Sequence, residues 1–171
     1  MKRRSALKSL SLAIGGLAAL PAWASSWTPD SIGTNTFLSF SDENILAEIV
    51  ETIIPETSTP GAKSLKVHQF AMRMINDCYG EAAKKSLKQG ISKTEELAKQ
   101  INNKSFVECD AKQRKDIILQ MSKMDDVSKK FVEMIKNLTI RGYTNSEYYM
   151  VNIQNYVMAP GFYHGCVPVK S

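Results

Sequence analysis

The chain has 171 residues and a formal net charge of +5, and 23% of its residues are charged. Four of its 22 lysines and arginines lie in residues 1–24, together with none of its 17 acidic residues, so residues 25–171 carry a net charge of only +1. A nearly neutral chain lacks the basic footprint of a nucleic-acid-binding protein, which excludes that class. The length of residues 25–171 suits one domain with its own core.

The N-terminus has the features of a twin-arginine export signal. Arg3 and Arg4 precede a short apolar run over residues 10–20, and Ala22 and Ala24 give the small-x-small pattern of a cleavage site after Ala24. The apolar run is too short to span a bilayer comfortably. Retention as a membrane anchor is the alternative to cleavage. The signal predicts a periplasmic protein that is exported already folded.

Apolar spacing predicts helices along most of the remaining chain. Residues 25–40 are polar and rich in turn formers, so they are predicted to be a linker or arm. A first helix is expected to start at Ser41 as N-cap and to stop at Pro55. A second helix should cover residues 67–78. Its inward stripe is predicted to consist of Val67, Phe70, Ala71, Met74, Ile75 and Cys78.

Apolar spacing predicts three further helices. One should run from about Glu81 to Ile101 with Ile101 inward, and Gly90 is a weak point at which it could split. Asp110 and Gln113 form a capping box at the start of the next. The last begins at Asp125-Asp126, and Gly142 is expected to end or bend it. Inward positions on these last two helices are predicted for Ile117, Ile118, Met121, Met124, Val127, Phe131, Met134, Ile135 and Leu138.

The C-terminal part is predicted to hold a short helix over residues 146–155 and an irregular tail. No segment of useful length alternates between apolar and polar residues as a strand would. The predicted fold class is therefore all-α, a single-domain bundle of five or six helices over residues 41–171.

Three cysteines have no metal-binding or haem-attachment spacing. Cys78, Cys109 and Cys166 lie 31 and 57 residues apart, which matches no zinc, iron–sulfur or haem pattern. In an oxidising compartment, three thiols predict one structural disulfide and one remaining thiol that is buried or intermolecular. The sequence leaves the pairing open.

The sequence contains no recognisable catalytic or cofactor-binding motif. A structural role is favoured for both histidines, His68 and His164, and the acidic pairs read as helix starts and solvated faces. No glycine-rich dinucleotide loop and no hydrolase nucleophile turn is present. We therefore predict no catalytic residue, no metal and no cofactor in this chain. The alternative is an enzyme that uses His68 or His164 with a carboxylate brought near by folding.

Aromatic residues gather in the C-terminal third. The set consists of Tyr143, Tyr148, Tyr149, Tyr156, Phe162 and Tyr163. Tyrosine is favoured at interfaces because it buries area and keeps a polar tip. Closure of the domain's own core explains the same residues equally well, so both interpretations stay open.

Four segments in order resemble the gluconate 2-dehydrogenase subunit 3 family. The first is IIPETSTPGA at residues 53–62, in which a helix ends in Ile-Pro and a Thr-Pro-Gly-Ala turn leads into the next helix. The others are FVECDAKQ at 106–113, the Leu-Thr-x-x-Gly-Tyr segment at 138–143 and the Pro-Gly-rich end at 160–168. The resemblance covers roughly residues 42 to 168, most of the chain after the signal.

The resemblance implies a small, non-catalytic subunit of a periplasmic dehydrogenase complex. The large partner in such complexes is a flavin (FAD) enzyme of the glucose-methanol-choline type that oxidises a sugar, a sugar acid or a polyol. A c-type cytochrome often accepts the electrons, and the complex can associate with the membrane. The small subunit supports maturation of the large one and its export through the twin-arginine translocase. The family assigns no catalytic residue to this subunit.

Two segments are the predicted partner contacts. They are the loop at 55–62 and the tail at 156–168. The residues chosen are Pro55, Thr59, Pro60, Gly61, Tyr143, Tyr156, Pro160, Tyr163 and Pro168. The alternative for the loop is that its prolines and glycine only connect two helices. The alternative for the whole protein is a free-standing periplasmic scaffold or chaperone without an oxidoreductase partner.

Overall fold

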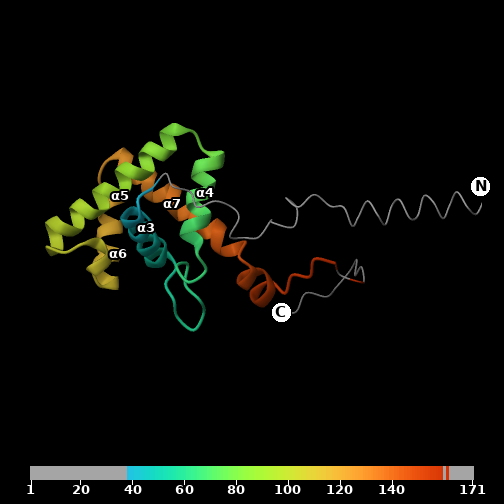
Figure 1. Ribbon diagram of the computed structural model, residues 1–171. Coiled ribbons are helices and arrows are strands. Elements are labelled where there is room, and N and C mark those ends of the chain that lie inside the picture. Colours follow the sequence, from blue (N-terminus) through green and yellow to red (C-terminus); the bar gives the residue numbers. More distant parts are fainter. Residues whose placement is uncertain (1–37, 160, 162–171) are drawn as a thin grey trace, which may run out of the picture. The chain divides into compact units, whose positions relative to one another are not determined.

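A computed structural model describes residues 38–159 and residue 161 of the chain. Over these residues it contains helices and no strand, which confirms the all-α prediction. The α-helices, labelled as in Figure 1, are α3 (Phe40–Ile53), α4 (Val67–Cys78), α5 (Glu81–Asn102), α6 (Ala111–Met121) and α7 (Asp126–Thr144). A 3₁₀ turn, η2 (Phe106–Glu108), precedes α6, and a π-helical turn, η3 (Tyr149–Ile153), follows α7. No described helix has the length and apolarity needed to cross a membrane.

Helices α3 and α5 are the central elements, because each contacts η2 and the four other α-helices. The N-cap of α3 is Ser39, whose hydroxyl oxygen accepts a hydrogen bond from the backbone N–H of Asp42 at 3.2 Å. The predicted cap at Ser41 was wrong by two residues, because Ser39 has the extended backbone that a cap requires and Ser41 is already helical. The helix ends at Ile53 as predicted. Ile54 turns extended because Pro55 follows it.

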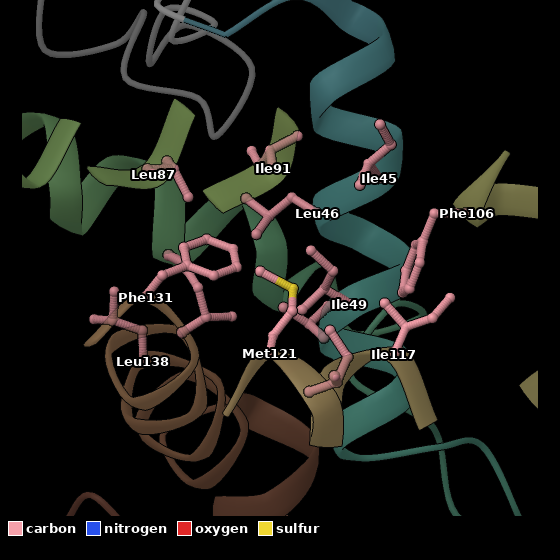
Figure 2. Packing of buried hydrophobic residues seen from close by; sticks show 14 of the residues in the cluster. Ile45, Leu46, Ile49, Leu87, Ile91, Phe106, Ile117, Met121, Phe131 and Leu138 are labelled. Carbon is pink, nitrogen blue, oxygen red and sulfur yellow. The ribbon is translucent and has the colours of Figure 1, made fainter. Parts of the chain in front are cut away.

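One apolar cluster joins all five α-helices and η2. Figure 2 shows Leu46 and Ile49 of α3 between side chains of α5, α6 and α7. The stripe predicted on α4 is largely confirmed, since Val67, Ala71 and Ile75 are buried. Cys78 is exposed rather than inward, because α4 ends there and the chain turns through two exposed residues into α5.

Gly90 does not split α5, which is continuous from Glu81 to Asn102. A Cβ atom at Gly90 would lie 2.2 Å from the ring of Phe131. The glycine therefore provides the space that lets α7 place this ring against α5. The prediction erred because the stabilising contact comes from a residue distant in sequence, which outweighs the local propensity cost.

The capping box of α6 is confirmed. The N–H of Gln113 donates to the carboxylate of Asp110 at 2.8 Å, and the N–H of Asp110 donates to the side chain of Gln113 at 3.1 Å. Helix α7 starts after Asp125 as predicted but continues past Gly142 to Thr144. Gly142 is buried within the helix, and a Cβ atom there would lie only 2.7 Å from the ring of Phe70, so the glycine leaves room for this ring.

Three apolar residues predicted to face inward are exposed instead. Ile101 lies in the last turn of α5, Met124 lies in the connection between α6 and α7, and Val127 lies in the first turn of α7. All three positions lie at or just beyond a helix end. The short helix predicted over 146–155 is present chiefly as the π-helical turn η3.

Candidate functional site

The loop at 55–62 is closed onto the end of α3 by a carboxylate. Glu51 accepts hydrogen bonds from the backbone N–H of Glu56 at 2.7 Å and from that of Lys63 at 2.9 Å. The N–H of Ala62 donates to the carbonyl of Ile54 at 2.9 Å, which brings the two ends of the loop together. The loop thus has a fixed shape although four of its residues, 55–58, are exposed.

Gly61 has a steric role in this closure. A Cβ atom there would lie 2.5 Å from a carboxylate oxygen of Glu51 and 2.6 Å from the backbone nitrogen of Glu56. Any larger residue would push the carboxylate away from the N–H groups that it binds. Gly61 is itself buried, so it stabilises the shape of the loop from the side that faces α3.

A second acidic residue of α3 fixes the far side of the loop. Glu48 is 7% exposed and accepts a hydrogen bond from the Nζ of Lys63 at 2.5 Å and another from the guanidinium of Arg114. Arg114 also donates to the backbone carbonyls of Phe106 at 3.2 Å and Val107 at 2.6 Å. This group of charges ties α3, the loop, η2 and α6 together.

Tyr143 connects the loop to the C-terminal part of the chain. Its hydroxyl donates to the carbonyl of Pro60 at 3.0 Å. Its ring meets that of Tyr149 edge to face, with centroids 5.9 Å apart and planes at 66°. The loop, the end of α7 and η3 therefore lie at the same end of the helical domain. Tyr143 is half-buried and helps to close the domain's own core, whereas Tyr156 is exposed and available for an interface.

A hollow of about 510 Å³ lies close to the place where Tyr143 connects the loop, the end of α7 and η3. It is lined by Leu65, Ser146, Glu147, Tyr148, Val151 and Asn152. The hollow brings the residues after the loop next to the start of the C-terminal segment. We refer to the loop at 55–62 together with residues 143–158 as the composite surface.

The C-terminal part of the composite surface exposes apolar side chains. Every residue from 151 to 159 is exposed, and the apolar ones include Val151, Ile153, Val157 and Met158. The predicted contact tail at 156–168 includes Val157 and Met158 as well as Tyr156, whereas Val151 and Ile153 lie before it and were not predicted. A signal for them exists in the sequence, because no Asp, Glu, Lys or Arg occurs between Glu147 and Lys170.

The predicted contact residues therefore fall into two groups. Pro55, Thr59, Pro60, Gly61 and Tyr143 come together in and beside the loop, and Tyr156 follows η3. The remaining predicted residues lie outside the described part of the chain. They are Arg3, Arg4, Ala22 and Ala24 of the signal, and Pro160, Tyr163 and Pro168 of the tail.

The described cysteines are not joined to each other. Cys78 is an exposed free thiol and Cys109 is a buried free thiol. The amide of Asn102 donates to the sulfur of Cys109 at 3.7 Å. Cys166 lies outside the described residues, so its predicted participation in a disulfide stays a prediction.

His68 is the one histidine within the described residues. Its Nε2 lies 3.7 Å from a carboxylate oxygen of Glu43, and its buried Nδ1 has no hydrogen-bond partner there. Burial lowers the pKa of His68, and the nearby Glu43 carboxylate opposes this shift. In residues 38–159 and 161, no group of three or more His, Cys, Asp or Glu side chains could hold a metal ion.

A comparison with known protein families identifies the family of this chain. The family model described as Gluconate 2-dehydrogenase subunit 3 matches residues 41–161. This range runs from the second residue of α3 through η3 and contains the whole composite surface. No curated protein and no solved structure matches the chain. The family match covers well over half of the 171 residues, and the chain therefore belongs to the gluconate 2-dehydrogenase subunit 3 family.

Proposed function

We propose that this chain is a non-catalytic accessory subunit of a periplasmic FAD-dependent dehydrogenase of the glucose-methanol-choline type. The observation that carries the proposal is the family match over residues 41–161, because the family is that of a subunit of a dehydrogenase complex. The large subunit would hold the flavin and oxidise a sugar, a sugar acid or a polyol. A c-type cytochrome subunit would accept the electrons.

The composite surface supports a role in binding another chain. Its loop has a fixed shape, set by Glu51 and by the hydrogen bond from Tyr143 to Pro60. Its C-terminal segment exposes apolar side chains without charged neighbours. Exposed apolar side chains in a charge-depleted segment are typical of surfaces that bind another protein.

The N-terminal sequence supports a role in export. The twin-arginine route accepts folded cargo, and the sequence of this chain contains no recognisable cofactor-binding motif. The folded cargo is then the flavin-loaded large subunit, carried through the translocase by the signal of this chain. The same association would assist maturation of the large subunit in the cytoplasm.

Gentle affinity purification of the tagged chain from its native cells tests the accessory role. We expect a stoichiometric large partner, identified by mass spectrometry, with flavin absorbance in the eluate. A solitary, colourless chain would contradict the proposal and favour a free-standing scaffold or chaperone. Turnover of a sugar substrate by the purified chain alone would instead identify an enzyme.

A second experiment tests the carrier role separately. Replacement of both Arg3 and Arg4 by lysine should leave the chain, and a large subunit that lacks its own signal, in the cytoplasm. Dehydrogenase activity is measured in periplasmic and cytoplasmic fractions, with a resident periplasmic enzyme exported by another route as control. Normal periplasmic activity in this variant would show that the partner does not depend on this signal.

A further inference from the structure

The residues after α7 form an uncharged segment unlike the rest of the chain. Charged residues make up 23% of the sequence, yet none occurs from Tyr148 to Val169. The same stretch is rich in tyrosine, methionine and branched apolar residues. Depletion of charge together with enrichment of aromatic residues and methionine is the compositional signature of the core of a protein interface.

From Val151 onward, the described part of this segment leaves its apolar side chains in solvent. The exposed fractions are 53% for Val151, 50% for Ile153, 53% for Tyr156, 62% for Val157 and 87% for Met158. The π-helical turn η3 has no buried residue at all. Other exposed apolar side chains of the domain, such as Leu119 and Ile140, are scattered singly over its helices. The segment is thus the place where exposed apolar side chains follow one another along the chain.

Backbone contacts give the segment a defined base. The N–H of Met150 donates to the carbonyl of Ser146 at 3.0 Å, and the N–H of Tyr156 donates to the carbonyl of Met150 at 2.8 Å. Asn155 adopts a left-handed conformation with φ of 51°, which turns the chain after η3. Tyr156 is held by its hydrogen bond directly after this turn, and Val157 and Met158 follow it. An ordered base of this kind lowers the entropy cost of binding.

We propose that residues 148–158 are the principal docking segment of this subunit and insert into an uncharged, apolar groove on the large flavoprotein subunit. This proposal rests on the proposed function, which supplies a partner other than a second copy of the chain. The uncharged sequence continues to Val169, so the segment is long enough to add to an interface of the obligate size, about 2,000 Å² or more. The loop at 55–62 forms the rim beside it.

The test uses the full-length tagged chain in its native cells. Val157 and Met158 are both replaced by aspartate, because both side chains are mostly exposed and contribute little to the stability of the chain's own fold. The matched control replaces Leu119 and Ile140 by aspartate, which are exposed apolar residues on α6 and α7. Large subunit retained per tagged chain is quantified by mass spectrometry and flavin absorbance. Circular dichroism melting of each purified variant verifies folding.

We expect the V157D/M158D variant to retain about tenfold less large subunit than the wild type, or lower still, since central apolar residues dominate interface energies. The L119D/I140D control should retain the wild-type amount. A V157K/M158K variant should lose the partner as well, because an apolar groove rejects either sign of charge. Loss with aspartate but not with lysine would overturn the apolar groove and indicate an acidic surface on the partner.

The outcomes separate this proposal from the proposed function. Wild-type retention of the large subunit by V157D/M158D would overturn the docking segment while leaving the accessory role intact. Absence of the flavoprotein from the wild-type sample would contradict both. Self-association of the wild-type chain, or co-sedimentation with phospholipid vesicles, that the V157D/M158D change abolishes without affecting flavoprotein binding would assign the segment to another partner and overturn the proposal.

Discussion

The hydroxyl of Tyr143 donates a hydrogen bond to the carbonyl of Pro60 at 3.0 Å, across 83 positions of sequence. Tyr143 lies in the last turn of α7, and Pro60 lies in the loop that follows α3. The same tyrosine ring contacts Tyr149 of η3. This single side chain therefore fixes the loop relative to the start of the docking segment.

Replacement of Tyr143 by phenylalanine should destabilise the chain by about 1 kcal/mol, the net contribution of a typical hydrogen bond. The ring contact with Tyr149 is preserved in this variant, so the change reports on the hydroxyl. Urea unfolding followed by circular dichroism measures the free energy of unfolding. Tyr79→Phe is the control, because Tyr79 is exposed at the end of α4. Equal stability of both variants would show that the bond to Pro60 contributes nothing.

Removal of the Glu48 carboxylate should lower the free energy of unfolding by much more than removal of the Tyr143 hydroxyl. Glu48→Ala leaves the guanidinium of Arg114 without its buried partner, and breaking such a pair costs about 3–5 kcal/mol. Lys63→Ala should cost about 1 kcal/mol or less, because the Lys63 side chain is 50% exposed. Both free energies of unfolding are measured by chemical denaturation.

Glu133→Ala is the control for the loss of a carboxylate, since Glu133 is exposed on α7. Its effect should stay within about 0.5 kcal/mol, as for most surface substitutions. Equal costs for Glu48→Ala and Lys63→Ala would show that the lysine, and not Arg114, is the principal partner of Glu48.

Sequence periodicity predicted the helices well because each depends on local information. The apolar stripe of α4 and the capping box of α6 involve residues within about three turns of one another. Wrong predictions occurred where a distant residue decides the outcome. Gly90 and Gly142 are breakers by local propensity, yet each creates space for an aromatic ring from another helix. Nothing within α5 or α7 alone indicates these contacts.

The composite surface was predicted in part. The loop was predicted from its prolines and glycine, and Tyr143 from its aromatic ring, because turn formers and aromatic residues are recognisable by type. The carboxylates that hold the loop were not found. Glu48 and Glu51 look like ordinary acidic residues of a helix, and their partners Arg114 and Lys63 lie up to 66 positions away. Val151 and Ile153 were not predicted, because their signal is the absence of charged residues after Glu147 and not an aromatic or turn-forming residue.

Stability should fall as the pH decreases below about 6.5, because of His68. Burial lowers the pKa of His68 from its ordinary value of 6.5, so the unfolded chain binds a proton at a higher pH than the folded chain does. Stability therefore rises with pH across this window, and the contribution of neutral His68 is complete above pH 6.5. The Glu43 carboxylate opposes the shift, whereas Lys63 and Lys66 add to it.

The measurement compares wild type with His68→Gln by urea unfolding between pH 7.5 and 5.5. We expect a shallower dependence on pH in the variant, because the titrating ring is gone. His164 is present in both proteins, so its contribution to the pH dependence cancels when the two are compared. Glu43→Gln should make the dependence steeper, because it removes the carboxylate that favours the charged ring. A steeper fall in His68→Gln than in wild type would contradict the burial argument.

Gly90→Ala should destabilise the protein although alanine is the better helix former. A Cβ atom at this position would lie 2.2 Å from the ring of Phe131, and overpacking of this kind costs about 1–3 kcal/mol. This cost opposes a helix-propensity gain of about 1 kcal/mol. The decisive comparison is a double-mutant cycle with Phe131→Leu, which shortens the side chain that the new methyl group meets. Gly90→Ala should cost less in the Phe131→Leu background, since part of the collision is relieved. Equal costs in both backgrounds would show that the glycine is needed for a reason other than the approach of α7 to α5.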